Sequence, residues 1–293
     1  MQPYAMLDER LRRGERIVLD GPMGSELVRR GVRWRDHGLR TDAAAVQALH
    51  SEYLGAGCDV LRTNTFGLNR RVYENVFRDQ AHMRHIGAPD LEQRVPMLIP
   101  KAVEVARAAR SAEGRENVPI AGVMSPLEHC FRPDLAPADG AAEHTEIAQL
   151  LADAGVDLLL LESMNTAREA RTALTAAKAT GLPVWLSFVV NAEGNVLSGE
   201  PVPVLEADAL LVNCAPPADI KEALGKQPVL KGGYAHIGKF DPPSWKFEFF
   251  PQFNCTEDWP APRYAAAVNG WDAQIVGCCC GATPEHIRAL KSS

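Results

Sequence analysis

The sequence predicts a (β/α)₈ barrel, on the basis of its length of 293 residues and of eight short apolar runs with helical patterns between most of them. The predicted strands cover residues 17–20, 59–64, 118–123, 156–162, 183–188, 209–214, 229–234 and 274–278. The predicted helices cover residues 43–56, 98–111, 142–154, 167–180, 218–224 and 284–290. Several of the strand runs are continuously apolar, which is typical of parallel strands buried on both faces.

A doubly wound parallel sheet is the alternative fold. Such a sheet normally carries a glycine-rich phosphate turn after its first strand, and Gly21-Pro22-Met23-Gly24 does not have the GxGxxG spacing. No domain boundary or internal repeat is visible, so residues 1–293 are expected to form one domain. Two long excursions, 70–96 and 235–262, are expected to be lids, interfaces or disordered segments.

Composition excludes several classes of protein. The net charge of −6 argues against nucleic acid as a partner, because phosphate binding needs a basic surface. No apolar run approaches the roughly 18 residues of a membrane span, and residues 1–16 lack the apolar core of a signal peptide. Seven cysteines in a chain of this length predict reduced thiols in a cytoplasmic enzyme. Cys58 and Cys130 are expected to be small buried side chains.

Polar or reactive residues follow most of the predicted strands. Asp20 ends the first, Arg62-Thr63-Asn64 the second, Glu162 the fourth, Asn213-Cys214 the sixth and Cys278-Cys279-Cys280 the eighth. In a (β/α)₈ barrel these ends face one mouth, where active sites lie. Residues more than 250 positions apart are therefore expected to share one pocket.

The three consecutive cysteines predict a metal site. Neighbours in an extended strand point to opposite faces, so adjacent cysteines can bind one ion only where the chain turns, and Gly277 and Gly281 allow that turn. Cys214 with two of these cysteines gives three thiolates and an open position, the arrangement of a catalytic zinc ion. A buried apolar cysteine cluster and a closed four-cysteine site that recruits Cys255 remain alternatives.

Asp20 and Glu162 are carboxylates expected in apolar surroundings, where they need partners. They either pair with Arg62 and backbone N–H groups or accept the ammonium group of a substrate. The sequence leaves both interpretations open.

At this point the chain resembles the homocysteine S-methyltransferase family, over nearly its whole length. The resemblance rests on Leu19-Asp20-Gly21-Pro22-Met23-Gly24-Ser25-Glu26-Leu27, Thr63-Asn64-Thr65-Phe66, Leu160-Leu161-Glu162-Ser163-Met164, Val212-Asn213-Cys214 and the closing segment from Val276 to Ile287. Counted back from Gly281, the family's adjacent zinc ligands fall on Cys279 and Cys280, and Cys278 stands where the family usually has glycine. The resemblance also implies that Asp20 and Glu162 hold the amino-acid acceptor, with Thr63 nearby.

The resemblance implies transfer of a methyl group from a small onium compound, of the S-methylmethionine, betaine or S-adenosylmethionine type, to the zinc-bound thiolate of homocysteine, giving methionine. Zinc is the expected cofactor, the thiol acceptor and the methyl donor are the expected small-molecule partners, and neither nucleic acid nor a membrane is expected. Homo-oligomerisation is left open.

Two segments depart from the family pattern, at residues 121–130 and 232–236. The alternative is therefore a zinc-dependent barrel that acts on, or only binds, another thiol or sulfur compound, or that takes its methyl group from a separate corrinoid protein.

Overall fold

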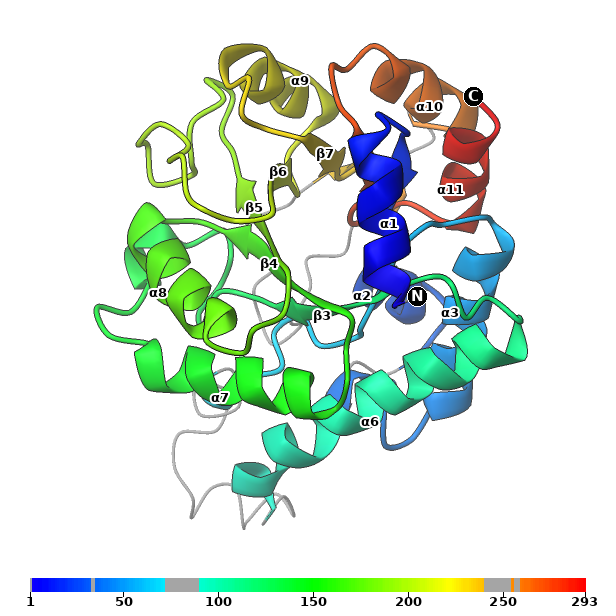
Figure 1. Ribbon diagram of the computed structural model, residues 1–293, viewed down its shortest axis with the longest axis vertical. Coiled ribbons are helices and arrows are strands. Elements are labelled where there is room, and N and C mark those ends of the chain that lie inside the picture. The colour runs from blue at the N-terminus through cyan, green and yellow to red at the C-terminus, as the bar shows by residue number, and fades with distance from the viewer. Residues whose placement is uncertain (1, 33–34, 72–89, 240–253, 256–258) are drawn as a thin grey trace.

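The computed structural model describes residues 2–293 except 33–34, 72–89, 240–253 and 256–258. Within these residues, one eight-stranded parallel sheet has the order β1-β10-β7-β6-β5-β4-β3-β2. A parallel bridge between Leu19 and Val60 joins its two ends, and the Asp59 N–H donates to the Val18 carbonyl at 2.7 Å. The sheet is thus closed, and the predicted (β/α)₈ barrel is confirmed (Figure 1).

The barrel strands lie close to their predicted positions. They are β1 (Ile17–Val18), β2 (Leu61–Arg62), β3 (Ile120–Met124), β4 (Leu158–Met164), β5 (Val184–Val189), β6 (Ala209–Asn213), β7 (Gly232–Ala235) and β10 (Ile275–Cys278). A two-stranded antiparallel ribbon, β8 (Gly238–Lys239) with β9 (Asn254–Cys255), follows β7. Every residue of the eight barrel strands is buried, as expected of strands covered on both faces.

Helices surround the barrel in Figure 1. They are α3 (Ala43–Gly55), α6 (Leu91–Ala112), α7 (Ala141–Asp153), α8 (Ala167–Lys178), α9 (Pro217–Lys226), α10 (Ala261–Asn269) and α11 (Pro284–Lys291). Shorter elements are α2 (Gly24–Arg29), η1 (Arg35–Gly38) and η2 (Pro133–Leu135). The first predicted excursion, 70–96, is partly wrong, because residues 91–96 belong to α6, and the second also ends in helix α10. Most of the remainder of both excursions lies outside the described residues.

Two apolar cores fill the fold. The outer core packs the helices against the barrel wall and includes Leu49, Ile99 and Leu161. The inner core fills the barrel with side chains such as Leu160, Trp185 and Tyr234, together with Cys214 and Cys279. Two of the predicted site cysteines therefore lie inside the barrel, among its interior side chains.

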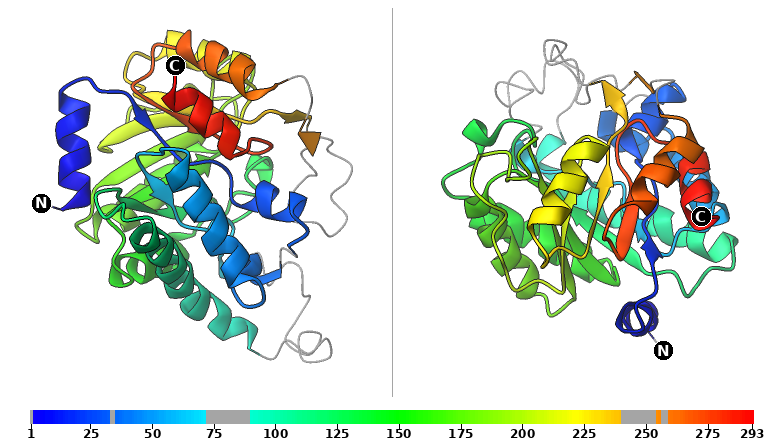
Figure 2. Two further views of the ribbon diagram at one scale, coloured as in Figure 1. Left: turned by 90° about the vertical axis from the view of Figure 1, so that its right-hand side faces the viewer. Right: turned by 90° about the horizontal axis from the view of Figure 1, so that it is seen from above.

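Helix α1 (Pro3–Arg12) was not predicted, and it covers the end of the barrel where the strands begin. Leu7 enters the inner core, and Trp185 Nε1 donates to the Tyr4 hydroxyl at 3.3 Å. Gln274, just before β10, donates to the Leu11 carbonyl at 2.5 Å. Figure 2 shows α1 at one end of the barrel and α2 near the other. The site is thereby restricted to the far end.

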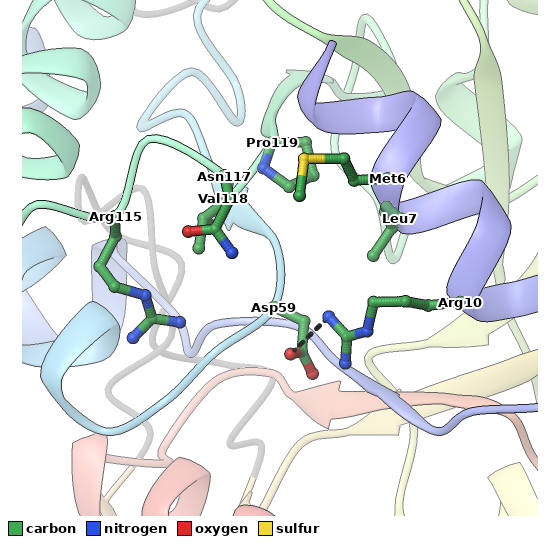
Figure 3. Close-up of a pocket in the computed structure, with 8 residues that line it drawn as sticks. All are labelled: Met6, Leu7, Arg10, Asp59, Arg115, Asn117, Val118 and Pro119. Atoms are coloured by element: carbon green, nitrogen blue, oxygen red, sulfur yellow. Dashed lines mark hydrogen bonds and ion pairs between the residues drawn. The ribbon is translucent and has the colours of Figure 1, made fainter. Parts of the chain in front are cut away.

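A small cavity lies beneath α1, between that helix and the starts of β2 and β3 (Figure 3). Its volume is about 40 Å³, and its polar lining includes Arg10, Asp59, Arg115 and Asn117. Arg10 already pairs with Asp59 at 3.0 Å. The space suits a water molecule rather than a substrate. No helix of the described residues is long and apolar enough to cross a bilayer.

His50 on α3 is expected to make the stability of the fold depend on pH. The side chain is fully buried, and within the described residues neither ring nitrogen has a hydrogen-bond partner. Burial lowers its pKa from 6.5 to about 3, so below pH 6.5 only the unfolded chain takes up this proton. Between pH 6.5 and pH 5, the free energy of unfolding of His50→Leu should therefore fall by about 2 kcal/mol less than that of the unaltered protein. Urea unfolding at several pH values measures this, and parallel curves for the two proteins would contradict it.

Candidate metal and substrate site

Three cysteine side chains meet at the mouth of the barrel. The sulfur atoms of Cys214, Cys279 and Cys280 lie within 4.8 Å of one another, and those of Cys279 and Cys280 are 4.0 Å apart. A tetrahedral zinc ion with Zn–S bonds near 2.3 Å holds its sulfurs about 3.8 Å apart. The three thiols thus have the spacing and the donor chemistry that zinc requires.

The chain turns immediately after β10, and this turn gives the adjacent cysteines one common target. Cys278 still belongs to the strand, is fully buried and packs into the outer core, whereas Cys279 joins the inner core. The Cys279 N–H donates to the Ala235 carbonyl at 2.9 Å, and the Cys280 carbonyl accepts from the Ile237 N–H at 3.0 Å. Gly281 completes the turn with φ of 86°, as the sequence predicted.

Gly277 has another role than the predicted one. A Cβ atom at this position would come within 2.8 Å of the Leu19 Cβ, so the glycine allows β10 to approach β1 closely. The conformational freedom used by the cysteine turn comes from Gly281.

Cys214 is held by a network of buried amide and hydroxyl groups. It has φ of 51°, and Ser163 at the end of β4 has φ of 63°, a conformation that is uncommon for residues other than glycine. The side chain of Asn213 accepts from the Ser163 N–H at 3.1 Å and from the Ser187 hydroxyl at 2.6 Å. Its Nδ2 donates to the Ser163 hydroxyl at 2.7 Å. Asn213 therefore holds the unusual backbone conformation of Ser163, while the Cys214 backbone is held by its N–H, which donates to the Tyr234 carbonyl at 3.1 Å.

The three thiols share their protons unequally. Hydrogen bonds from Cys214 and Cys280 hold the pKa of Cys279 well below its ordinary value. The hydrogen bond to Cys279 raises the pKa of Cys214 well above its ordinary value. The cluster thus accommodates a first negative charge readily, which is the property needed to attract a cation.

Arg62 lies between the two predicted carboxylates. Its Nε contacts Asp20 Oδ1 at 2.6 Å, and its Nη1 contacts Glu162 Oε1 at 2.5 Å. Its Nη2 donates to the carbonyls of Asp20 and Cys278, at 2.8 and 3.0 Å. The guanidinium also lies over the Tyr234 ring, 5.0 Å from the centroid. The pairing with Arg62, one of the two interpretations left open by the sequence, is present for both carboxylates.

The two carboxylates differ in what they leave unengaged. Asp20 is fully buried. Its second carboxylate oxygen, Oδ2, accepts from the backbone N–H of Arg62 at 2.9 Å. Glu162 keeps a slight exposure of 7 %, and its contact with Arg62 uses Oε1. Desolvation raises the pKa of both groups, opposed by the charge of Arg62. Two carboxylates around one guanidinium carry an excess of one negative charge when both are ionised.

Thr63 is used within the barrel wall. Its hydroxyl accepts from the Val123 N–H at 2.9 Å and lies 2.7 Å from the Thr65 hydroxyl, which donates to the Val123 carbonyl. The side chain is 3 % exposed. These contacts connect the ends of β2 and β3 beside the site.

Two residues near the thiols, Cys130 and Tyr234, were not identified from the sequence, whereas the buried position of Cys58 was. The prediction that Cys130 is a small buried side chain is wrong, because it is partly exposed; desolvation raises the pKa of its thiol, and the charges of Cys279 and Glu162 raise it further. Tyr234 lies inside the barrel, where only its position at the end of a strand could have indicated it. Cys58 is buried, as predicted. The side chain of Cys255 lies outside the described residues.

The sequence model of the family described as homocysteine S-methyltransferase matches residues 17–293. The chain belongs to the homocysteine S-methyltransferase family. The members of this family are methyltransferases, so the resemblance seen in the sequence motifs is confirmed.

Relatives within the homocysteine S-methyltransferase family differ in length. Betaine–homocysteine S-methyltransferase 1 of Bos taurus is 26 % identical, over 96 % of this chain and 73 % of its own length. Methionine synthase of Mycobacterium tuberculosis is 24 % identical over 94 % of this chain, but the chain spans only 24 % of that protein. The metallated form of the homocysteine methyltransferase MmuM from Escherichia coli has the same fold, with a TM-score of 0.71, 24 % identity and 98 % coverage of both chains.

We expect Arg62→Met to lower the free energy of unfolding by about 3–5 kcal/mol, because it leaves two buried carboxylates without their counter-charge. Arg132→Met is a suitable control, since the Arg132–Asp134 pair is solvent-exposed and should matter little. Urea unfolding at neutral pH measures both. A loss for Arg62→Met no larger than that of the control would show that the carboxylates do not depend on the guanidinium.

Proposed function

We propose that this protein transfers a methyl group from a small onium compound to the thiol of homocysteine, giving methionine, with a zinc ion held by Cys214, Cys279 and Cys280. The observation that carries the proposal is the meeting of three thiols beside a carboxylate pair that has an excess negative charge. The first group suits a metal that binds a thiol, and the second suits an ammonium group. Homocysteine has both functional groups.

The donor set supports zinc. Three thiolates are soft ligands that favour zinc over magnesium or calcium, and three protein ligands leave one position for a substrate. Zinc bound there would stabilise the thiolate form of the acceptor, which is the nucleophilic form.

Glu162 would receive the ammonium group of the acceptor. It ends a buried strand, so it is held rigidly, and it lies close enough to Cys279 for the two charges to influence each other. Arg62 orients the carboxylate through Nη1 and leaves the other oxygen for the substrate. Asp20 would contribute the second negative charge through Arg62, and Thr63 would support the neighbouring strand ends.

The methyl donor would enter from the mouth of the barrel. Phe66, after β2, and Phe131, after β3, pack partly exposed against the inner core, and aromatic faces attract onium groups.

The acceptor sulfur would displace the donor in line, with the electron pair of the breaking C–S or C–N bond remaining on the donor. This step needs no general base, and the residues of the barrel contribute alignment of the two substrates. The name of the Bos taurus relative supports betaine as a donor. Three unpaired thiols in one site also favour a reducing, cytoplasmic location.

The proposal predicts that the zinc-loaded protein forms methionine from homocysteine with at least one of S-methylmethionine, betaine and S-adenosylmethionine. Cys279→Ser should neither bind zinc nor form methionine. Cys278→Ala changes a side chain of the outer core, so it should be less stable but still bind zinc and form methionine. Mass spectrometry of the products and elemental analysis of the protein measure these outcomes. Zinc retained by Cys279→Ser, or no product with any donor and several thiol acceptors, would contradict the proposal.

Glu162→Ala should raise the KM for homocysteine about a hundredfold or more and leave the KM for the donor nearly unchanged, because the ammonium loses its charged partner. Glu169→Ala provides a control, since Glu169 is a buried carboxylate on α8 that contacts the Leu127 N–H and His144. It should lose stability without a change in either KM. An unchanged homocysteine KM in folded, zinc-loaded Glu162→Ala would assign Glu162 to the structural pairing with Arg62 alone.

A further inference from the structure

Tyr234 occupies the centre of the site without belonging to the thiols or the carboxylates. It lies on β7, is fully buried and contributes to the inner core. Its carbonyl accepts from the Cys214 N–H at 3.1 Å. The Arg62 guanidinium lies over its ring, 5.0 Å from the ring centroid. The residue therefore touches both the strand that presents Cys214 and the cation that holds Glu162.

The hydroxyl of Tyr234 is the unexplained part of this side chain. It lies close enough to the Glu162 carboxylate and to the Ser187 hydroxyl for these groups to influence one another, but within the described residues it makes no hydrogen bond of ordinary distance and angle. A buried hydroxyl without a partner destabilises a fold, and phenylalanine would fill the same space without that disadvantage. The packing alone thus gives no reason for the oxygen atom.

The neighbours of the hydroxyl restrict what it can do. The Ser187 hydroxyl donates to Asn213 Oδ1 at 2.6 Å, so it could meet the Tyr234 hydroxyl only as an acceptor, and a neutral hydroxyl is a weaker acceptor than an ionised carboxylate. Glu162 receives one donor on Oε1 from Arg62, and a carboxylate has room for about four. The Glu162 carboxylate is therefore the natural acceptor for the phenolic proton.

We propose that Tyr234 is a positioning residue for the amino-acid acceptor, whose hydroxyl donates to Glu162 when an ammonium group is bound. Glu162 is then held by Arg62 on one oxygen and by Tyr234 as an additional donor, so the carboxylate cannot rotate away from the ammonium. The ring of Tyr234 keeps Arg62 in place throughout. This inference rests on the proposed function and assigns to Tyr234 the recognition of the amino group, separate from the recognition of the thiol.

The test uses Tyr234→Phe, which keeps the ring over Arg62 and removes only the hydroxyl. Calorimetry measures the binding of homocysteine and of 4-mercaptobutanoate, which lacks the amino group, to the full-length zinc-loaded protein. Tyr234→Phe should bind homocysteine about tenfold more weakly, the value of one hydrogen bond, and 4-mercaptobutanoate within about twofold of the unaltered protein. Zinc content should not change. Kinetically, the KM for homocysteine should rise with kcat within about twofold.

Tyr4→Phe is the matched control, because it removes a tyrosine hydroxyl at the opposite end of the barrel, beside Trp185. It should leave both affinities unchanged. Unchanged binding of homocysteine by Tyr234→Phe, or equal weakening of both thiols, would overturn the role in recognising the ammonium. If the unaltered zinc-loaded protein binds neither thiol, the proposed function itself fails, which is a different and recognisable result.

Discussion

The buried side chain of Arg62 connects the strands on which the whole site depends. It comes from β2, contacts Asp20 after β1 and Glu162 on β4, and donates to the Cys278 carbonyl on β10. The seam where the barrel closes lies between β1 and β2, next to this contact. Removing a guanidinium and two carboxylates from water is unfavourable, so their arrangement persists only because every group finds a partner. The contacts of Arg62 beside this seam therefore hold Glu162 near the thiols.

Two local backbone conformations then orient the cysteine side chains toward one another. The turn at Gly281 brings Cys280 to the same side as Cys279 while Cys278 remains in the outer core. At the end of β6, Cys214 has a left-handed backbone conformation, and its N–H donates to the Tyr234 carbonyl. Backbone conformations of this kind are unfavourable alone and are typical of functional sites, where neighbouring contacts determine them. Three thiols from two strands thereby meet within 4.8 Å.

Much of this architecture is predictable from the sequence, because apolar runs and the residues that end them specify which side chains reach the mouth of a barrel. The positions of Asp20, Glu162 and Cys214 follow from that rule. Helix α1 does not, because Leu7 is its one buried side chain among the described residues and four of its ten residues, Asp8, Glu9, Arg10 and Arg12, are charged. The sharing of Arg62 between two carboxylates and the unpaired hydroxyl of Tyr234 depend on side-chain directions across the barrel, which no local pattern specifies.

In the proposed site, three cysteine thiols hold zinc and leave one position for the thiol of the acceptor. X-ray absorption spectroscopy at the zinc edge counts the sulfur atoms around the metal most directly. We expect three sulfurs at about 2.3 Å from zinc in the protein alone and four after homocysteine is added. Four sulfurs before the acceptor is added would indicate a closed site with a further cysteine, and a count that stays at three would show that the acceptor thiol does not reach the metal. Either result would contradict the account.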